Sequence, residues 1–545
     1  MKIKSTGLIR LISSLILPQI LSCIDFKQFS ITMPNRHTDT LFQLVKSLGK
    51  SEKRNFKLYI NRTTSSEELK IVQLFDALDK MDDYDEAVLL KKNKSIKKQQ
   101  LSNLKAYLYK QILSSLRLIN DESNIDIQLH EQMDYARILY NKGLYLQSLK
   151  VLDKMKEQAK NYNQLTYLQQ ALFFEKKIEG LYITRSLKNR AEELSKEADE
   201  VNDHLSAVSK LSNLALQLYG WYIKNGFARD DEEEEAVKNF LNNNLPANLQ
   251  HPNGFYEKLY LYQCYCWKAF IRQDFLQYYR YTQKWVDIFE EEPYMIAIES
   301  GHYIKGMHNL MGAHFNLGNY QKLNDTLEQF EKFCHSKTVQ QNQNNLIQCF
   351  IYHTISLLNK HFISGNFSEG LLLVEGIEAK LKEYEIYLDR HRILVIYYKI
   401  ACMYFGAGDF ETTIDYLNKI INWKVDLRSD LQCYARLLHL IAHYELGNFQ
   451  LLEYLAKSVY RFMAKMRNLS VVEEEMFKFL RKALSLSPKQ LKPEFEKLLN
   501  KLKQFENRRF ETRAFMYLDV ISWLESKINN VAVQEITQKK YLSRK

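Results

Sequence analysis

A short turn motif recurs through most of this 545-residue chain and constrains its fold more than any other feature. The best example is residues 401–420, ACMYFGAGDFETTIDYLNKI, in which a Gly-Asp-Phe segment separates two amphipathic runs. Tyr404 and Ala401 precede Gly408 by four and seven residues, a spacing that places both on one face of a helix. Glycine tolerates a positive φ, and Asp409 can cap the next helix through its side chain. The segment therefore predicts two helices joined by a tight turn.

Equivalent turns recur along the chain at nearly constant intervals. The positions that correspond to Gly408 are Gly143, a weak unit near Leu187, Gly226, Gln273, Gly318, Gly365 and Gly447. Consecutive positions are 44, 39, 47, 45, 47, 43 and 39 residues apart. A step of about 40–47 residues suits a pair of long helices, and its repetition indicates an array in which each pair contacts its neighbours. The low content of glycine and proline, 17 and 7 residues, agrees with helices joined by short turns.

Two units carry a residue pattern similar to that of tetratricopeptide repeats. The pattern comprises Ala401, Tyr404, Gly408, Phe410, Leu417 and Ile420 in one unit, and Ala136, Gly143, Tyr145, Ser148 and Leu152 in the other. The resemblance covers about residues 130–460 and implies an all-α fold, a right-handed α-solenoid of antiparallel helix pairs. The step exceeds the roughly 34 residues of that family, and its Trp-Leu signature and closing proline are missing, so armadillo or HEAT-type pairs remain the alternative. The segment LFQLVKSLGKSEKRNFKLY, from Leu41, also resembles the opening of an uncharacterised bacterial helical-repeat family.

Apolar stripes and chain breaks divide the sequence into five parts. Residues 1–32 form an ambiguous extension, 33–120 a basic helical module, 121–465 the tetratricopeptide-like repeats, 466–528 capping helices and 529–545 a frayed tail. Three apolar stripes at helical spacing predict the helices of the module. After residue 465 the repeat pattern stops, and Pro488 and Pro493 interrupt the chain. An array needs such an atypical terminal unit to cover its last apolar face.

The net charge of +11 is concentrated at the N-terminal end, because residues 33–120 hold 17 Lys and Arg against 10 Asp and Glu. A candidate basic patch lies in the segment KKNKSIKK and comprises Lys91, Lys92, Lys94, Lys97 and Lys98. Such a patch could bind the phosphates of nucleic acid or of anionic lipid, which makes a nucleic-acid-associated regulator one alternative function. The segment lacks interleaved aromatic residues and a recognised motif, and a solvated loop and helix start is the simpler interpretation.

Residues 1–32 allow two interpretations of where the protein works. Lysines precede an apolar stretch that ends in ILSC at Cys23, a sequence similar to a lipoprotein cleavage box. Arg10 and Ser13 interrupt that stretch, and Met33 offers a second start. We expect a cytoplasmic protein that starts near Met33, with a cell-envelope lipoprotein anchored at Cys23 as the alternative. No other segment approaches the roughly 20 apolar residues of a membrane span, and seven scattered cysteines without a CxxC pair suit free thiols in a reducing compartment.

The sequence contains none of the usual catalytic or cofactor motifs. A phosphate-binding glycine loop, GxSxG, HExxH and a dinucleotide fingerprint are all missing. His314, His361 and His443 each precede a turn glycine by four residues, but they belong to three different repeats and so do not predict a metal cluster. The six acidic residues at 230–235 suit a helix start rather than a spaced set of ligands. We therefore expect no enzyme activity, no cofactor and no metal, and favour a protein–protein interaction scaffold.

An aromatic residue recurs three positions before the turn residue, with Ile223 as the one exception among the clear units. This row comprises Tyr140, Phe270, Phe315, Phe362, Phe405 and Tyr444. In tetratricopeptide repeats the matching position of the first helix faces the concave groove that receives peptides, so the resemblance suggests a partner-binding groove lined by these rings. The alternative is that the rings pack inside each helix pair or between neighbours, because aromatic stripes at helical spacing are usually core.

Overall fold

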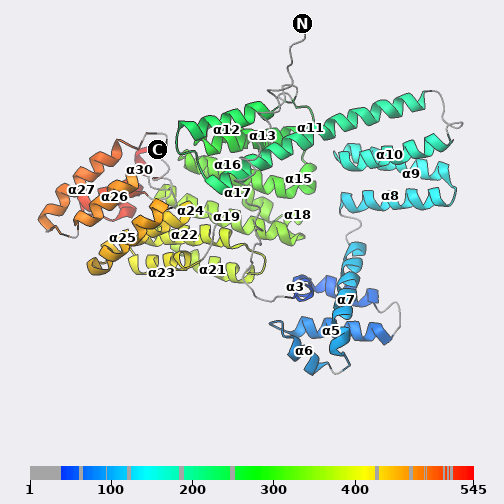
Figure 1. Cartoon of the computed structure of the whole chain (residues 1–545), viewed down its shortest axis with the longest axis horizontal. Helices are drawn as coiled ribbons and strands as arrows, with labels where there is room; N and C mark the ends of the chain where they lie inside the picture. The colour runs from blue at the N-terminus through cyan, green and yellow to red at the C-terminus, as the bar shows by residue number, and fades with distance from the viewer. Residues whose placement is uncertain are drawn as a thin grey trace, which may run out of the picture. The chain divides into compact units, whose positions relative to one another are not determined.

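The chain is all-α within the part that the structure describes (Figure 1). The computed structural model describes residues 39–60, 66–93, 95–119, 124–182, 189–245, 249, 252–423, 429–465, 471–483, 485–486, 488–506, 508, 510–511, 515 and 519–544. These ranges contain helices, turns and loops but no strand. The chain divides into two compact units, Met1–Gln128 and Leu129–Lys545. This division falls inside a helix, a few residues beyond the composition boundary at residue 120.

The first unit is a small helical module with its own core. Its helices are α3 (Thr40–Ser47), α4 (Lys50–Ile60), α5 (Ser66–Lys80), α6 (Glu86–Lys92) and α7 (Lys98–Ile119). Asp39 caps α3 by accepting hydrogen bonds from the amides of Leu41 and Phe42 at 3.1 Å. The fully buried rings of Phe56 and Phe75 lie 4.7 Å apart at the centre of the module.

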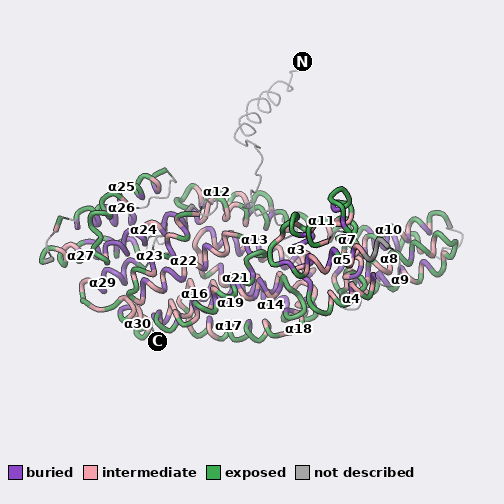
Figure 2. The backbone as a smooth tube through the Cα atoms, turned by 90° about the horizontal axis from the view of Figure 1, so that it is seen from below, coloured by how far each residue is buried: buried purple, intermediate pink, exposed green. Residues whose placement is uncertain are grey.

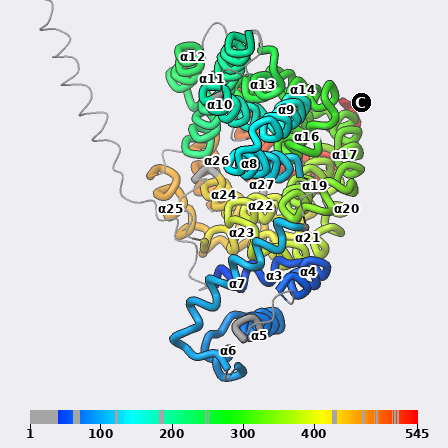
Figure 3. The backbone as a smooth tube through the Cα atoms, turned by 90° about the vertical axis from the view of Figure 1, so that its right-hand side faces the viewer, coloured from blue at the N-terminus to red at the C-terminus, as the bar shows by residue number. Residues whose placement is uncertain are grey.

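The second unit consists of helices that pack in neighbouring pairs. It begins with α8 (Ile125–Asn141), α9 (Tyr145–Asn161), α10 (Leu165–Tyr182), α11 (Arg190–Asn225), α12 (Asp231–Asn244), α13 (Phe255–Ile271), α14 (Phe275–Glu291) and α15 (Met295–Ile298). It continues with α16 (Ser300–Asn316), α17 (Tyr320–Cys334), α18 (Lys337–Gln340), α19 (Gln343–Ser364), α20 (Phe367–Leu371), α21 (Val374–Glu383), α22 (Arg390–Ala407), α23 (Phe410–Ile421), α24 (Ser429–Glu445) and α25 (Phe449–Lys465). Most helices that follow one another pack together, and the first helices of successive pairs also make contact, as α19 does with α16 and with α22 (Figure 3).

The turns between paired helices have the backbone geometry that the sequence predicts. Gly318 and Gly408 adopt φ angles of +67° and +89°, which confirms the prediction of a glycine-favoured conformation. Gln273 takes the same left-handed conformation, at φ +57°, without being a glycine. At Gly408 the amide donates to the carbonyl of Phe405 at 3.1 Å, and the next amide donates to the carbonyl of Tyr404 at 3.0 Å. The weak turn near Leu187 lies outside the described residues.

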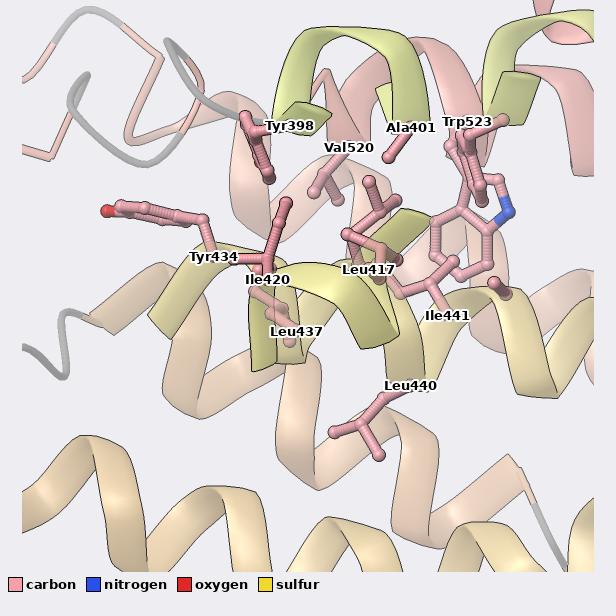
Figure 4. Packing of buried hydrophobic residues seen from close by; sticks show 14 of the residues in the cluster. Tyr398, Ala401, Leu417, Ile420, Tyr434, Leu437, Leu440, Ile441, Val520 and Trp523 are labelled. Atoms are coloured by element: carbon pink, nitrogen blue, oxygen red, sulfur yellow. The ribbon is translucent and has the colours of Figure 1, made fainter. Parts of the chain in front are cut away.

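Four further helices, the closing helices, follow the last helix pair in the described part of the chain. They are α26 (Val471–Ala483), α27 (Pro488–Lys503), α29 (Val520–Asn529) and α30 (Val533–Arg544). Trp523 and Val520 of α29 pack beside Leu417 and Ile441 of the last helix pairs in one apolar cluster (Figure 4). The indole of Trp523 also donates to Glu445 at 2.6 Å. Buried residues line the faces where helices meet, whereas exposed residues follow the outer faces (Figure 2).

The expectation of a frayed tail at 529–545 is wrong, because residues 533–544 form helix α30 and contact α19, α22 and α29. The polar composition of this segment suggested exposure to water. Its polar side chains bond instead to other parts of the chain: Gln534 accepts from the amide of Ser368, in the first turn of α20, at 2.9 Å. Ile536 is buried, and the ring of Tyr541 lies 5.1 Å from that of Tyr320.

Candidate functional site

Four of the six aromatic residues in the predicted row line one cavity of about 560 Å³ in the second unit. They are Phe270 of α13, Phe315 of α16, Phe362 of α19 and Phe405 of α22. Three of these rings are half-buried, and Phe405 is buried with 5% of its surface exposed. The four helices are the first members of consecutive helix pairs, so a single cavity extends across several pairs.

Three of these four residues take part in the same turn hydrogen bond. The carbonyls of Phe270, Phe315 and Phe405 each accept a hydrogen bond from the amide of the residue three positions later, at 3.0, 3.0 and 3.1 Å. The row residue therefore occupies the same position in the last turn of each helix. Because the side-chain direction follows from that position, rings at equivalent positions can line the same cavity.

The ends of the predicted row do not belong to this cavity. Tyr140 packs within its own part of the array, where its ring lies 5.5 Å from Phe174 of α10. Tyr444 is buried at the closing helices, and its ring lies 6.3 Å from that of Trp523. The central residues of the row thus line the cavity, whereas Tyr444, at its C-terminal end, packs in the core.

The sequence pattern missed the residues that complete the cavity wall. Many of them lie three, seven or ten positions before a row residue, on the same helical face: Trp267, Lys305, His308, Tyr352, Asn359, Tyr398 and Cys402. These intervals are the signal that could have found them once the row was known. Asn309 and Lys399 lie six positions before Phe315 and Phe405. Tyr219 and Tyr222 of α11 extend the wall toward the N-terminal side.

Two lysines place ammonium groups against the aromatic wall. The Nζ atom of Lys305 lies 4.1 Å from the ring centroid of Tyr219 and 5.3 Å from that of Trp267. The Nζ atom of Lys399 lies 5.4 Å from Phe315 and donates to Oδ1 of Asn359 at 2.6 Å. Removal of water from around these groups lowers the pKa of Lys305, and it lowers the pKa of Lys399 to about 8.

His308 lies among the cations of the cavity. Its ring stacks on Tyr352 with a centroid distance of 4.1 Å and an interplanar angle of 14°. Burial lowers the pKa of His308 to about 3, and the positive charges of Lys305, Lys399 and Arg392 act in the same direction. The imidazole is therefore neutral at physiological pH, with a ring nitrogen that can accept a hydrogen bond.

The candidate basic patch lies in the first unit, at the junction of two helices. Lys91 and Lys92 end α6, Lys98 begins α7, and all three side chains are exposed, as is that of Lys97. Lys94 lies outside the described residues. Ile96 is buried between these lysines and anchors the loop to the core of the module. This arrangement is a solvated loop with two charged helix ends.

The three turn histidines occupy equivalent backbone positions and remain separate. The carbonyls of His314, His361 and His443 each accept from the amide five residues later, at 2.9, 3.1 and 3.0 Å. Within the described residues no group of three or more His, Cys, Asp or Glu side chains is placed to hold a metal ion. None of the described helices has the length and hydropathy that crossing a bilayer requires. Cys23 and Met33 lie outside the described residues.

In comparisons with known proteins, no protein-family model and no curated protein matches the chain.

Proposed function

We propose that this protein is a non-catalytic interaction scaffold whose central cavity receives a short segment of a protein partner. The observation that carries the proposal is the convergence of Phe270, Phe315, Phe362 and Phe405, from four successive helix pairs, on one cavity. Binding sites of this volume are usually lined by aromatic and apolar side chains with a few polar groups that fix the orientation of the ligand. Aromatic anchors at the centre of such a site contribute most of the binding energy.

The proposal includes a right-handed, tetratricopeptide-like solenoid. Repeated contacts support it, because Ser148 donates to the carbonyl of Ala136 at 2.8 Å and the hydroxyl of Thr413, which donates to the carbonyl of Asp409 at 2.7 Å, lies 3.5 Å from the carbonyl of Ala401. These two pairs link equivalent positions of the two units whose sequences resemble that family. The proposal keeps the cytoplasm as the compartment, supported by the free thiols of the described cysteines.

Selection from a displayed library of random twelve-residue peptides tests this function. The parent protein should enrich related peptides, and the double variant Phe315→Ala, Phe362→Ala should bind them at least tenfold more weakly. Phe173→Ala is the matched control, because Phe173 is an exposed aromatic residue outside the cavity. Thermal unfolding of each variant separates lost affinity from lost folding.

The outcome that contradicts the proposal is equally clear. Absence of enriched peptides, or equal binding by the parent and a folded double variant, would show that the cavity does not receive a partner segment.

A further inference from the structure

The cavity has an excess of positive charge. Lys305, Lys399 and Arg392 line it, and Asp519 is the one carboxylate among the described lining residues. Asp519 is engaged at the start of α29, where it accepts from the amide of Ser522 at 2.9 Å. Arg392 has a neighbour in Asp389 at 3.2 Å, whereas neither lysine forms an ion pair with a described carboxylate. The two ammonium groups are therefore uncompensated by negative charge.

Two polar atoms of the same wall also lack partners among the described residues. Asn309 is more than nine-tenths buried, and its Nδ2 atom donates no hydrogen bond, although its Oδ1 atom accepts from Tyr278 at 3.3 Å. The Nδ1 atom of His308, the preceding residue, is likewise buried without a partner. Buried polar groups normally have hydrogen-bond partners, so an unpaired amide in a cavity indicates a position for a ligand atom.

The charges and the unpaired amide lie on helices α16 and α22 of the same cavity wall. Lys305, His308 and Asn309 lie three and one residues apart on α16, a spacing that places them on one face of the helix. The positive charges of Lys399 and Arg392, on α22, lower the pKa of His308. The half-buried rings of Phe315 and Phe362 flank Lys399 at 5.4 and 5.5 Å. A ligand whose charged group lies in this region would therefore have an apolar surface beside that group.

We infer that the cavity selects an amphipathic anion, with its carboxylate attracted by the ammonium groups of Lys305 and Lys399 and its apolar part against Phe315 and Phe362. The carboxylate would compensate both ammonium groups and accept a hydrogen bond from Nδ2 of Asn309. This inference rests on the proposed function and deepens it: the segment that enters the cavity carries an acidic side chain flanked by apolar residues.

Calorimetric titration with three ligands of equal chain length tests the selection: decanoate, decylammonium and 1-decanol. The parent protein should bind decanoate at least tenfold more tightly than decylammonium, with 1-decanol between them. This comparison needs no variant, so it stands even where a substitution impairs folding. Equal or tighter binding of decylammonium overturns the inference.

Variants then locate the anion. The double variant Lys305→Met, Lys399→Met should bind decanoate at least tenfold more weakly and 1-decanol as tightly as the parent. Lys284→Met is the matched control, because Lys284 also lies near aromatic rings, at 5.6 and 5.7 Å, but outside the cavity. Unchanged decanoate binding by the folded double variant also overturns the inference.

The two proposals fail in different ways. A preference for decanoate with no enriched peptide contradicts the partner-segment function and leaves the anion site standing. Enriched peptides together with equal binding of decanoate and decylammonium contradict the anion site alone.

Discussion

Gln538 donates a hydrogen bond from Nε2 to Oδ1 of Asn366 at 3.1 Å and so fastens the last helix to the turn after α19. Gly365, in that turn, permits the close approach, because a Cβ atom there would lie 2.7 Å from the amide nitrogen of Gln538. Val533 and Thr537 of the same helix line the cavity. The segment that composition assigns to a frayed tail is therefore part of the cavity wall.

Substitution of Gly365 by alanine should loosen helix α30. Gly365→Ala and Gly408→Ala both place a Cβ at positive φ, which costs about 1 kcal/mol in each. The space around Gly408 is open, so only the alanine at 365 meets the backbone of α30. Hydrogen exchange of residues 533–544 should accelerate in Gly365→Ala and stay unchanged in Gly408→Ala. Equal protection in both variants would show that α30 does not depend on this contact.

The aromatic row should divide into residues that stabilise the fold and residues that bind. Phe405 is buried, with Phe410 at 5.4 Å, and Phe405→Ala should lower the free energy of unfolding by about 3–5 kcal/mol. Phe362 is half-buried at the cavity, and Phe362→Ala should cost only roughly 1–2 kcal/mol while weakening ligand binding. Urea unfolding together with peptide or decanoate titration measures both effects. A larger loss of stability in Phe362→Ala than in Phe405→Ala would contradict this division.

The sequence predicted the turns well because their chemistry is local. A left-handed residue followed by a helix cap requires glycine or a tolerant polar residue, so Gly318 and Gly408 are visible without knowledge of their neighbours. The centre of the aromatic row was predictable for the same reason, since its register is counted from the turn. Its ends were not, because the surroundings of Tyr444 depend on Trp523, which belongs to helices outside the repeat pattern.

The charged part of the site could not be predicted from local pattern. Lys305 is unusual only because Tyr219 and Trp267, on two other helices, place their rings around its ammonium group. In the sequence it is one of many lysines on amphipathic helices. The contact of α30 could not be predicted either, because the role of Gln538 depends on its hydrogen bond to Asn366, which is far from it in the sequence.

A buried ionic group should make a larger contribution to stability than a surface pair. Glu175, with 3% of its surface exposed, accepts hydrogen bonds from Lys156 and from Arg190. Glu175→Gln removes the buried charge that both cations share, although Lys156 keeps Asp153 at 3.0 Å and Arg190 keeps Glu193 at 3.6 Å. The variant should cost about 2 kcal/mol in urea unfolding. Glu453→Gln is the control, because Glu453 pairs with Lys457 at 2.9 Å on the surface and its loss should leave the unfolding midpoint unchanged. Similar midpoints for both variants would refute the special role of Glu175.

Buried histidines should make the fold sensitive to acid. Burial lowers the pKa of His314 and of His439 to about 4, from an ordinary value of 6.5. Between these values the unfolded chain binds protons that the folded protein does not, so stability falls as the pH drops from 6.5 toward 4. Each histidine should contribute a slope of about 1.4 kcal/mol per pH unit over that interval.

Denaturant unfolding of His314→Gln across this pH range checks the slope. The variant should show a shallower loss of stability than the parent, even where its stability at neutral pH is lower. His130→Gln, at an exposed position, controls for replacing a histidine as such. A slope in His314→Gln as steep as that of the parent would mean that this histidine does not supply the acid sensitivity.

Anion binding in the cavity should weaken at alkaline pH. Desolvation lowers the pKa of Lys399 to about 8, so its amine loses its positive charge as the pH rises above that value, while a carboxylate ligand stays ionised. Cys402, on the same helix, has its pKa raised to about 12 by burial and stays neutral over the range. The dissociation constant of decanoate should therefore rise above pH 8, by up to tenfold per pH unit, and that of 1-decanol should not change. Lys399→Arg keeps its charge throughout and should retain decanoate binding up to pH 9.5. If the parent binds decanoate equally at pH 7 and pH 9.5, the charge of Lys399 does not hold the anion.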